Sequence, residues 1–185
     1  LEGEAAVSGY HADNVGPALL GGITLITGTQ PDQIFALPVP ENLYFALITP
    51  DVAVPTAQAR AVLPAQVPLR TLVAQTAGVG EFIDALYRGD LARAAAAMEK
   101  DAVIEPARAS LMPRLAEARA AAKRAGALAL VISGAGPTLA AVCDQVETAQ
   151  RVAGAIKMVY DEVGLGSRLH TTRVSQEGAS LVALL

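Results

Sequence analysis

Hydrophobic residues recur along the chain at two periods, which together predict an α+β fold. Short apolar runs bounded by glycine or proline predict strands at residues 23–26, 34–39, 43–49, 127–132, 139–143, 168–175 and 179–184. Apolar residues at three- and four-residue steps predict helices over residues 69–87, 90–98, 114–125 and 146–160. This mixed order is typical of an α+β sandwich with helices on one face of an antiparallel sheet.

Three of these helices carry end signals in the sequence. Asp90 stands where an N-terminal cap is expected, and Gly126 stands where a left-handed residue would end the preceding helix. Asp144 and Glu147 resemble a capping box with aspartate in place of serine or threonine. The helices are therefore expected to begin and end at these residues.

Two of the helices carry apolar stripes that are expected to face a core. The stripe of the longest helix consists of Leu69, Leu72, Val73, Phe82, Ile83, Leu86 and Tyr87. The stripe of the last helix consists of Val146, Ala149, Val152, Ala153, Ile156, Val159 and Tyr160. Gly78 and Gly80 interrupt the first stripe and predict a kink or a break there.

The first forty residues follow a different pattern. Residues 1–9 resemble the last turns of a helix, and a polar turn at 11–14 follows. Pro17 then fits the first turn of a short helix that ends at Gly21. We place a domain boundary near residue 41.

Composition excludes several classes of function. Hydrophobic residues make up 52% of the chain and charged residues 17%, which is too apolar for disorder. Apolar stretches are too short for a membrane span, so a soluble protein is expected. The net charge of -4, without a basic block or tryptophan, disfavours nucleic-acid binding. The lone Cys143 predicts a buried thiol in a reducing cytoplasm, and two histidines form no zinc motif.

The segment between the strands over 127–132 and 139–143 is rich in glycine. It reads Ser133, Gly134, Ala135, Gly136, Pro137 and Thr138. Bare backbone at a tight bend leaves N–H groups free to face an anion. A plain glycine turn between two buried strands is the more common interpretation, and the local sequence leaves both open.

Polar residues near the N-terminus form a second candidate site. His11, Asp13 and Asn14 offer an imidazole, a carboxylate and an amide to a small polar ligand. Asp13 or Asn14 could equally cap the helix that contains Pro17. Glu4 is either a solvated carboxylate or an oxygen ligand for Mg²⁺.

Two arginines in the middle of the chain complete the candidates. Thr56 and Arg60 lie one helical turn apart. Either Thr56 caps the helix and Arg60 is an exposed arginine, or the hydroxyl and the guanidinium together bind a carboxylate. Glu105, Pro106 and Arg108 fit the start of a helix with proline at its first position and an arginine on its surface. In the functional interpretation, Arg108 offers a second guanidinium to the same carboxylate. Two arginines, a hydroxyl and the His/Asn turn together suit an amino-acid-like ligand.

Taken in order, these segments resemble the C-terminal portion of the homoserine kinase family, within the GHMP kinase superfamily. The similar segments cover essentially the whole chain and are residues 1–4, 11–15, 17–22, 56–64, 105–108 and 133–138. The resemblance implies a ferredoxin-like C-terminal domain over 42–185, preceded by a remnant of the N-terminal domain over 1–41. A homodimer is also implied.

The resemblance implies ATP-dependent phosphorylation of the side-chain hydroxyl of L-homoserine. It implies that Glu4 holds Mg²⁺, that Asn14 orients the substrate hydroxyl, and that Arg60 and Arg108 bind the α-carboxylate. His11, Asp13 and Thr56 would line the amino-acid pocket. The glycine segment would fold beside the nucleotide phosphates, in keeping with catalysis by positioning and charge stabilisation.

The chain departs from the family pattern in two respects. Ala135 stands where serine is common, which loses one hydroxyl. The long Gly/Ser-rich phosphate loop and the first substrate motif of the family do not occur in these 185 residues. We therefore expect a truncated chain that is inactive alone. The alternatives are another GHMP small-molecule kinase and a non-catalytic ferredoxin-like binding or dimerisation module.

Overall fold

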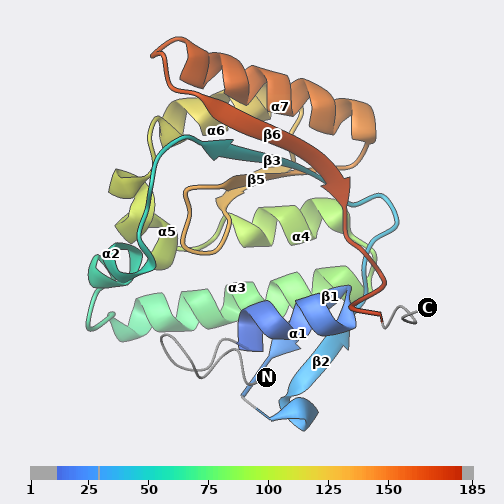
Figure 1. Cartoon of the computed structure of the whole chain (residues 1–185). Helices are drawn as coiled ribbons and strands as arrows, with labels where there is room; N and C mark the ends of the chain where they lie inside the picture. Colours follow the sequence, from blue (N-terminus) through green and yellow to red (C-terminus); the bar gives the residue numbers. More distant parts are fainter. Residues whose placement is uncertain (1–11, 29, 181–185) are drawn as a thin grey trace, which may run out of the picture. The chain divides into compact units, whose positions relative to one another are not determined.

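A computed structural model describes residues 12–28 and 30–180 of the chain (Figure 1). The described residues form two compact units. The first unit comprises residues 12–41 and 174–180, and the second comprises 42–173. The predictions for residues 1–9, including Glu4, and for His11 lie outside the described residues.

The first unit is a short helix on a two-stranded sheet. Its helix is α1 (Ala12–Leu20), and its antiparallel strands are β1 (Ile23–Ile26) and β2 (Ile34–Leu37), joined through the 3₁₀ turn η2 (Pro31–Gln33). A Cβ on Gly16 would lie 3.1 Å from the Cδ1 atom of Ile26, so the glycine lets α1 approach the hairpin closely. The C-terminal segment joins this unit because Gly22 N–H donates to the Ser175 carbonyl at 2.7 Å.

The start of α1 corrects one prediction. The helix begins at Ala12, so Asp13 and Asn14 lie in its first turn, and Pro17 lies in its middle. Proline there removes the hydrogen bond to the Asp13 carbonyl and its ring crowds that carbonyl, so it lowers the stability of α1. The predicted end is confirmed, since Gly21 has a φ of +73° and its N–H donates to the Pro17 carbonyl at 2.9 Å.

The second unit is built on a four-stranded antiparallel sheet. The strands are β3 (Tyr44–Pro50), β4 (Ala129–Ile132), β5 (Leu139–Cys143) and β6 (Ser167–Arg173), in the spatial order β4-β5-β3-β6. Ile48 stands at the centre, opposite Leu139 on one side and Leu169 on the other. These four strands confirm the sequence prediction to within two residues. Ala179 and Ser180, predicted to begin a last strand, are not in a strand.

Helices lie on both sides of this sheet. They are α2 (Thr56–Ala61), α3 (Leu69–Tyr87), α4 (Leu91–Met98), α5 (Ile104–Arg108), the 3₁₀ turn η3 (Ala109–Leu111), α6 (Leu115–Arg124) and α7 (Val146–Asp161). Figure 1 shows α6 and α7 over one face and α3 with α4 on the opposite side. The architecture is the predicted α+β fold with an antiparallel sheet, but the prediction that helices cover a single face was incomplete.

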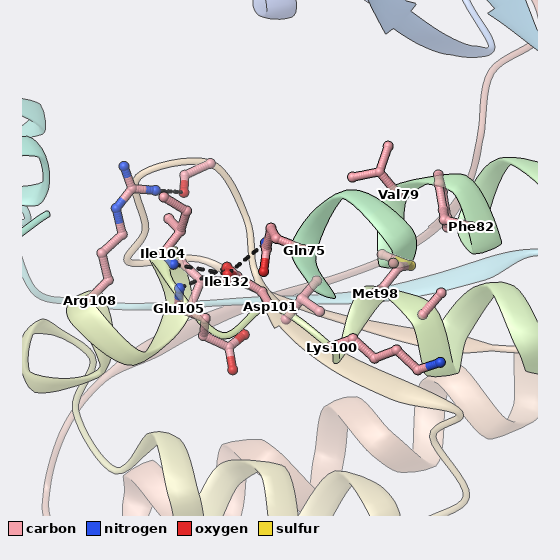
Figure 2. Close-up of a pocket in the computed structure, with 14 residues that line it drawn as sticks. Gln75, Val79, Phe82, Met98, Lys100, Asp101, Ile104, Glu105, Arg108 and Ile132 are labelled. Atoms are coloured by element: carbon pink, nitrogen blue, oxygen red, sulfur yellow. Dashed lines mark hydrogen bonds between the residues drawn. The ribbon is translucent and has the colours of Figure 1, made fainter. Parts of the chain in front are cut away.

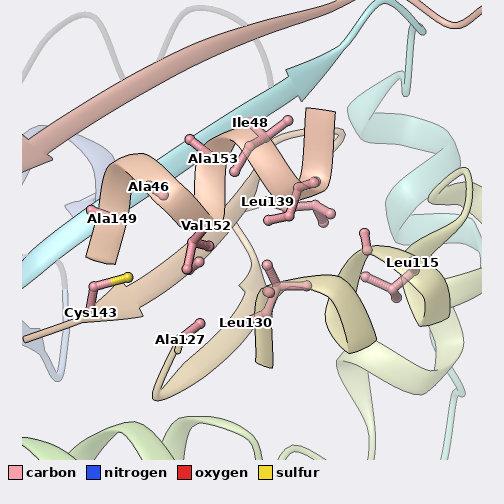
Figure 3. Packing of buried hydrophobic residues seen from close by; sticks show 14 of the residues in the cluster. Ala46, Ile48, Leu115, Ala127, Leu130, Leu139, Cys143, Ala149, Val152 and Ala153 are labelled. Carbon is pink, nitrogen blue, oxygen red and sulfur yellow. The ribbon is translucent and has the colours of Figure 1, made fainter. Parts of the chain in front are cut away.

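The main core fills the layer between the sheet and the pair α6 and α7 (Figure 3). Small residues such as Ala149 and Ala153 let α7 pack closely on the alternating inward residues Ala46 and Ile48 of β3. Cys143 is buried there as predicted, and burial, with the nearby Asp144 carboxylate, raises the pKa of its thiol to about 11. Within the described residues, no helix has the length and hydropathy needed to cross a bilayer.

The structure confirms two of the predicted helix ends and corrects a third. The Asp90 carboxylate accepts from the Arg93 N–H at 3.0 Å, and Gly126 follows α6 with a φ of +104°. The predicted capping box at Asp144 is wrong, because the N-cap is Gln145, which makes no side-chain capping bond. Val146, which was predicted to belong to the buried stripe, is 37% exposed and lies outside it.

The long helix α3 differs from expectation in two ways. It runs without a break through both glycines, which cost helix propensity but impose no end. Much of its predicted apolar stripe is exposed, with Leu69 at 75% and Val73 at 61% of full exposure. The buried residues of this helix are Ala85 and Leu86, near its C-terminal end, and of these only Leu86 belongs to the predicted stripe.

Tyr160 allows a direct test of this core. Its hydroxyl is buried, and no described protein group lies within hydrogen-bonding reach; burial raises its pKa to about 12. Removing an unsatisfied buried hydroxyl should stabilise, so Tyr160→Phe should raise the free energy of unfolding by about 1 kcal/mol. Chemical denaturation measures the change. A loss of similar size would show that the hydroxyl has a partner and that the packing described here is wrong.

Candidate functional site

The glycine segment forms the closed turn of the hairpin between β4 and β5. Ser133 N–H donates to the Thr138 carbonyl at 2.9 Å, and Gly136 N–H donates to the Ser133 carbonyl at 3.0 Å. Gly134 and Gly136 have φ values of +57° and +85°, which favour glycine. Within the described part of the chain, the N–H groups of Gly134 and Ala135 have no protein acceptor. The segment is thus both a hairpin turn and a source of free backbone donors.

The Arg108 side chain joins this turn to α2. Its Nη1 donates to the Gly134 carbonyl at 2.8 Å, as Figure 2 shows, and its Nε donates to the Ala59 carbonyl at 3.1 Å. Ala59 is fully buried and lies next to Arg60 in the chain. Three segments chosen from the sequence, around residues 59, 108 and 134, therefore meet at one guanidinium. Thr56 and Arg60 lie one turn apart on α2, and both are exposed.

A hydroxyl pair ties the same turn to the sheet. Thr138 Oγ1 and Thr49 Oγ1 lie 2.8 Å apart and are partly buried. Thr49 belongs to the central strand β3, so this hydrogen bond connects the end of the turn with a rigid element. The sequence singled out Thr138 but gave no reason to pair it with Thr49.

The short helix α5, which carries Arg108, depends on Asp101. The Asp101 carboxylate accepts the N–H groups of Val103, Ile104 and Glu105 at 2.8–2.9 Å. Pro106 follows and has no N–H, so the first turn of α5 leaves no backbone donor unsatisfied. Burial alone would raise the pKa of Asp101, but these three donors and Gln75 hold it below its ordinary value. The helix consequently starts two residues before the predicted position of Pro106 at N1.

The far side of α5 is held by a charged network. Arg119 donates to Glu105 and, at 3.0 Å, to the Leu130 carbonyl. Glu99 accepts the Leu130 N–H at 2.9 Å and pairs with Lys123. Side chains thus satisfy both backbone groups of Leu130 on the edge strand β4 and link that strand to α5. Sequence reasoning missed Asp101, Glu99 and Arg119; an aspartate just before an apolar run that ends in proline was the available signal for the first.

The charges of Arg60 and Arg108 are both available for an anion. Among the described residues, neither guanidinium forms an ion pair with a carboxylate, and the two bonds of Arg108 go to neutral carbonyls. A guanidinium has five N–H donors, so Arg108 keeps three. Arg108 and Gly134 also border a cavity of about 390 Å³ (Figure 2).

The remaining site residues predicted from the sequence either belong to the first unit or lie outside the described residues. Asp13 and Asn14 are exposed in the first turn of α1. Glu4 and His11 lie outside the described residues. Where side chains are described, no three His, Cys, Asp or Glu residues gather as a metal site. The roles predicted for these four residues stay predictions.

Comparisons with known proteins identify relatives along nearly the whole chain. The family model "GHMP kinases C terminal" matches residues 82–162. Homoserine kinase of Arabidopsis thaliana is 38% identical over 185 residues, which are 98% of this chain and 50% of that protein. Homoserine kinase of Chlorobium phaeobacteroides (strain BS1) is 36% identical over 98% of this chain and 58% of its own length.

A solved structure agrees with these sequence matches. The crystal structure of homoserine kinase from Cytophaga hutchinsonii superposes with a TM-score of 0.87 at 40% identity, over 91% of this chain and 53% of that one. The chain thus spans about half the length of the curated relatives it matches.

The Asp101 cap predicts a specific pH dependence. Folding lowers the pKa of Asp101 from its ordinary 3.8, so the stabilisation is present above that value and is lost as the pH falls through the lower folded-state pKa. Asp101→Asn should lower the free energy of unfolding by about 1–2 kcal/mol at pH 7, with the difference shrinking below pH ~4. Denaturation at several pH values measures it.

Asp161→Asn is the matched control for this measurement. It removes an exposed ion pair with Lys157, which is expected to contribute only a few tenths of a kcal/mol. A difference between Asp101→Asn and the wild type that is equally large at pH 3 and pH 7 would contradict the assigned role of the carboxylate.

Proposed function

Because the chain is a homologue of the homoserine kinases and carries a GHMP kinase C-terminal domain, we propose that it is the amino-acid-binding part of an ATP-dependent homoserine kinase. In the proposed reaction the side-chain oxygen of L-homoserine attacks the γ-phosphorus of ATP. The bond from that phosphorus to the β-γ bridging oxygen breaks, ADP leaves, and the hydroxyl proton is released. The products are O-phospho-L-homoserine and ADP.

The contact of Arg108 with the carbonyls of Ala59 and Gly134 is the observation that carries this proposal. It supports a common site for the α2 segment, the α5 segment and the glycine turn. In the proposed site, Arg60 and Arg108 bind the α-carboxylate of homoserine, since their charges have no described carboxylate partner. Charge-assisted bonds of this kind hold a small zwitterion in a fixed orientation.

The glycine turn supplies the second half of the argument. The unpaired N–H groups of Gly134 and Ala135 suit phosphate oxygens, because backbone donors at a bend bind anions without side-chain obstruction. Asn14 is proposed to orient the substrate hydroxyl, while His11, Asp13 and Thr56 line the pocket. Glu4 would hold Mg²⁺, which when bound would neutralise phosphate charge. Catalysis then depends mainly on positioning and charge stabilisation.

Residues 1–185 alone should show no homoserine-dependent formation of ADP. The Gly/Ser-rich phosphate loop of the superfamily does not occur in this sequence, so the nucleotide would be held weakly. A coupled assay of ADP release, with and without L-homoserine, measures the activity. Turnover by the purified chain without a partner would refute this expectation.

Arginine substitutions test the carboxylate assignment in a protein extended at its N-terminus to the length of the relatives. Arg60→Ala or Arg108→Ala should raise the homoserine KM about tenfold or more, because each removes a charge-assisted bond, and should change the ATP KM much less. Arg124→Ala, at the end of α6, is the matched control and should change neither. Equal effects on both KM values would discredit the assignment.

A further inference from the structure

The cavity beside Arg108 lies within the second unit and is formed by four of its elements. It has a volume of about 390 Å³, and α3, the end of α4, α5 and the end of β4 contribute to its wall. This is the size range of cavities that take small organic ligands. In Figure 2, Val79, Phe82 and Met98 gather at one side of the view and the Arg108 side chain lies at the other.

The wall is mainly apolar, and its polar groups are mostly satisfied by the protein. Lys100 pairs with Glu81, and Glu105 pairs with Arg119. The Asp101 carboxylate is surrounded by four N–H donors, three from the backbone and one from Gln75. Those donors disperse its charge, which leaves it little capacity for a ligand.

Arg108 is the exception among the charged residues of this wall. Its guanidinium has only neutral carbonyl partners among the described residues, so its positive charge is not compensated. An apolar cavity with one uncompensated cation at its border complements a ligand with an apolar body and one negative group. A strongly polar ligand such as homoserine itself would leave polar groups unpaired against Val79 and Phe82.

We infer that this cavity binds small monocarboxylates with an aliphatic or aromatic body, whose carboxylate lies on Arg108. Binding itself does not depend on the proposed kinase activity. If Arg108 also holds the substrate carboxylate, a ligand in this cavity competes for the same guanidinium and regulates that site; this consequence rests on the proposed function.

Titration of 3-phenylpropionate into residues 1–185, followed by calorimetry and by amide NMR, tests the inference without ATP or homoserine. Saturable binding is expected, with shift changes at the amides of Val79 and Ile132. The uncharged 3-phenylpropan-1-ol should bind about tenfold more weakly or worse, since it lacks the charge-assisted bond. Equal affinity for the acid and the alcohol, or no saturable binding of the acid at millimolar concentration, overturns the inference.

Two glycines of α3 provide matched variants. Gly78 lines the cavity, and a Cβ there would make only an ordinary contact, 3.8 Å from Lys100 Cβ. Gly80 has open space around it and does not line the cavity. Both Gly78→Leu and Gly80→Leu improve helix propensity, so both should fold. Gly78→Leu should fill the cavity and abolish binding, whereas Gly80→Leu should leave it unchanged; equal binding by the two variants overturns the inference.

Charge variants separate the two cations of the wall. Arg108→Gln should weaken 3-phenylpropionate binding about tenfold, while Lys100→Gln should change it less than twofold because Lys100 is already paired with Glu81. Circular dichroism establishes that each variant is folded. A larger effect of Lys100→Gln than of Arg108→Gln contradicts the placement of the carboxylate on Arg108. Because no kinase substrate is present, failure here leaves the proposed kinase reaction standing, and the reverse also holds.

Discussion

The arrangement of the second unit around its candidate site depends on one guanidinium. Arg108 donates to the carbonyl of Ala59 on one side and to that of Gly134 on the other. These carbonyls belong to segments 49 and 26 residues away from it in the chain. Without this bridge, no described hydrogen bond would connect the short helix α2 with the hairpin turn through α5. Because both acceptors are neutral, the bridge also leaves a positive charge at the point where the segments meet.

The rest of the unit holds that guanidinium in place. A five-residue helix is not stable alone, so α5 needs outside support. Asp101 binds its N-terminal N–H groups, and Glu105 reaches Arg119 on α6. Arg119 in turn contacts the edge strand β4, next to the hairpin turn. The first turn of α5 is thus held by hydrogen bonds to charged groups, which are stronger than those between neutral groups. Arg108, the last residue of the helix, adds its own bonds to the carbonyls of Ala59 and Gly134.

Local patterns predicted the elements well where local chemistry decides them. Asp90 caps the beginning of α4, and Gly126 follows the end of α6, both as expected. The alternation of apolar residues placed Ile48 in the sheet correctly. The patterns failed where contacts with other parts of the fold determine the structure. The motif that begins at Asp144 contains suitable capping side chains, but it does not show which residue becomes the N-cap. In the structure the N-cap is Gln145. The apolar stripe of α3 identifies a hydrophobic face without showing what, if anything, covers it.

For the same reason, only part of the candidate site could be predicted from the sequence. Residue types and order selected Arg60, Arg108 and the glycine segment, but the bridge from Arg108 to two distant carbonyls is long-range and leaves no local trace. Asp101 was overlooked because its role depends on three backbone donors that only the fold presents to it. Glu4 and His11 lie outside the described residues. The roles predicted for them, and for Asp13 and Asn14, are untested.

Side-chain NMR of the arginines in residues 1–185 tests the bridge most directly. We predict a slowly exchanging Arg108 Nε–H with a scalar coupling across the hydrogen bond to the Ala59 carbonyl carbon. A signal that exchanges as fast as that of Arg124, with no such coupling, would contradict the account.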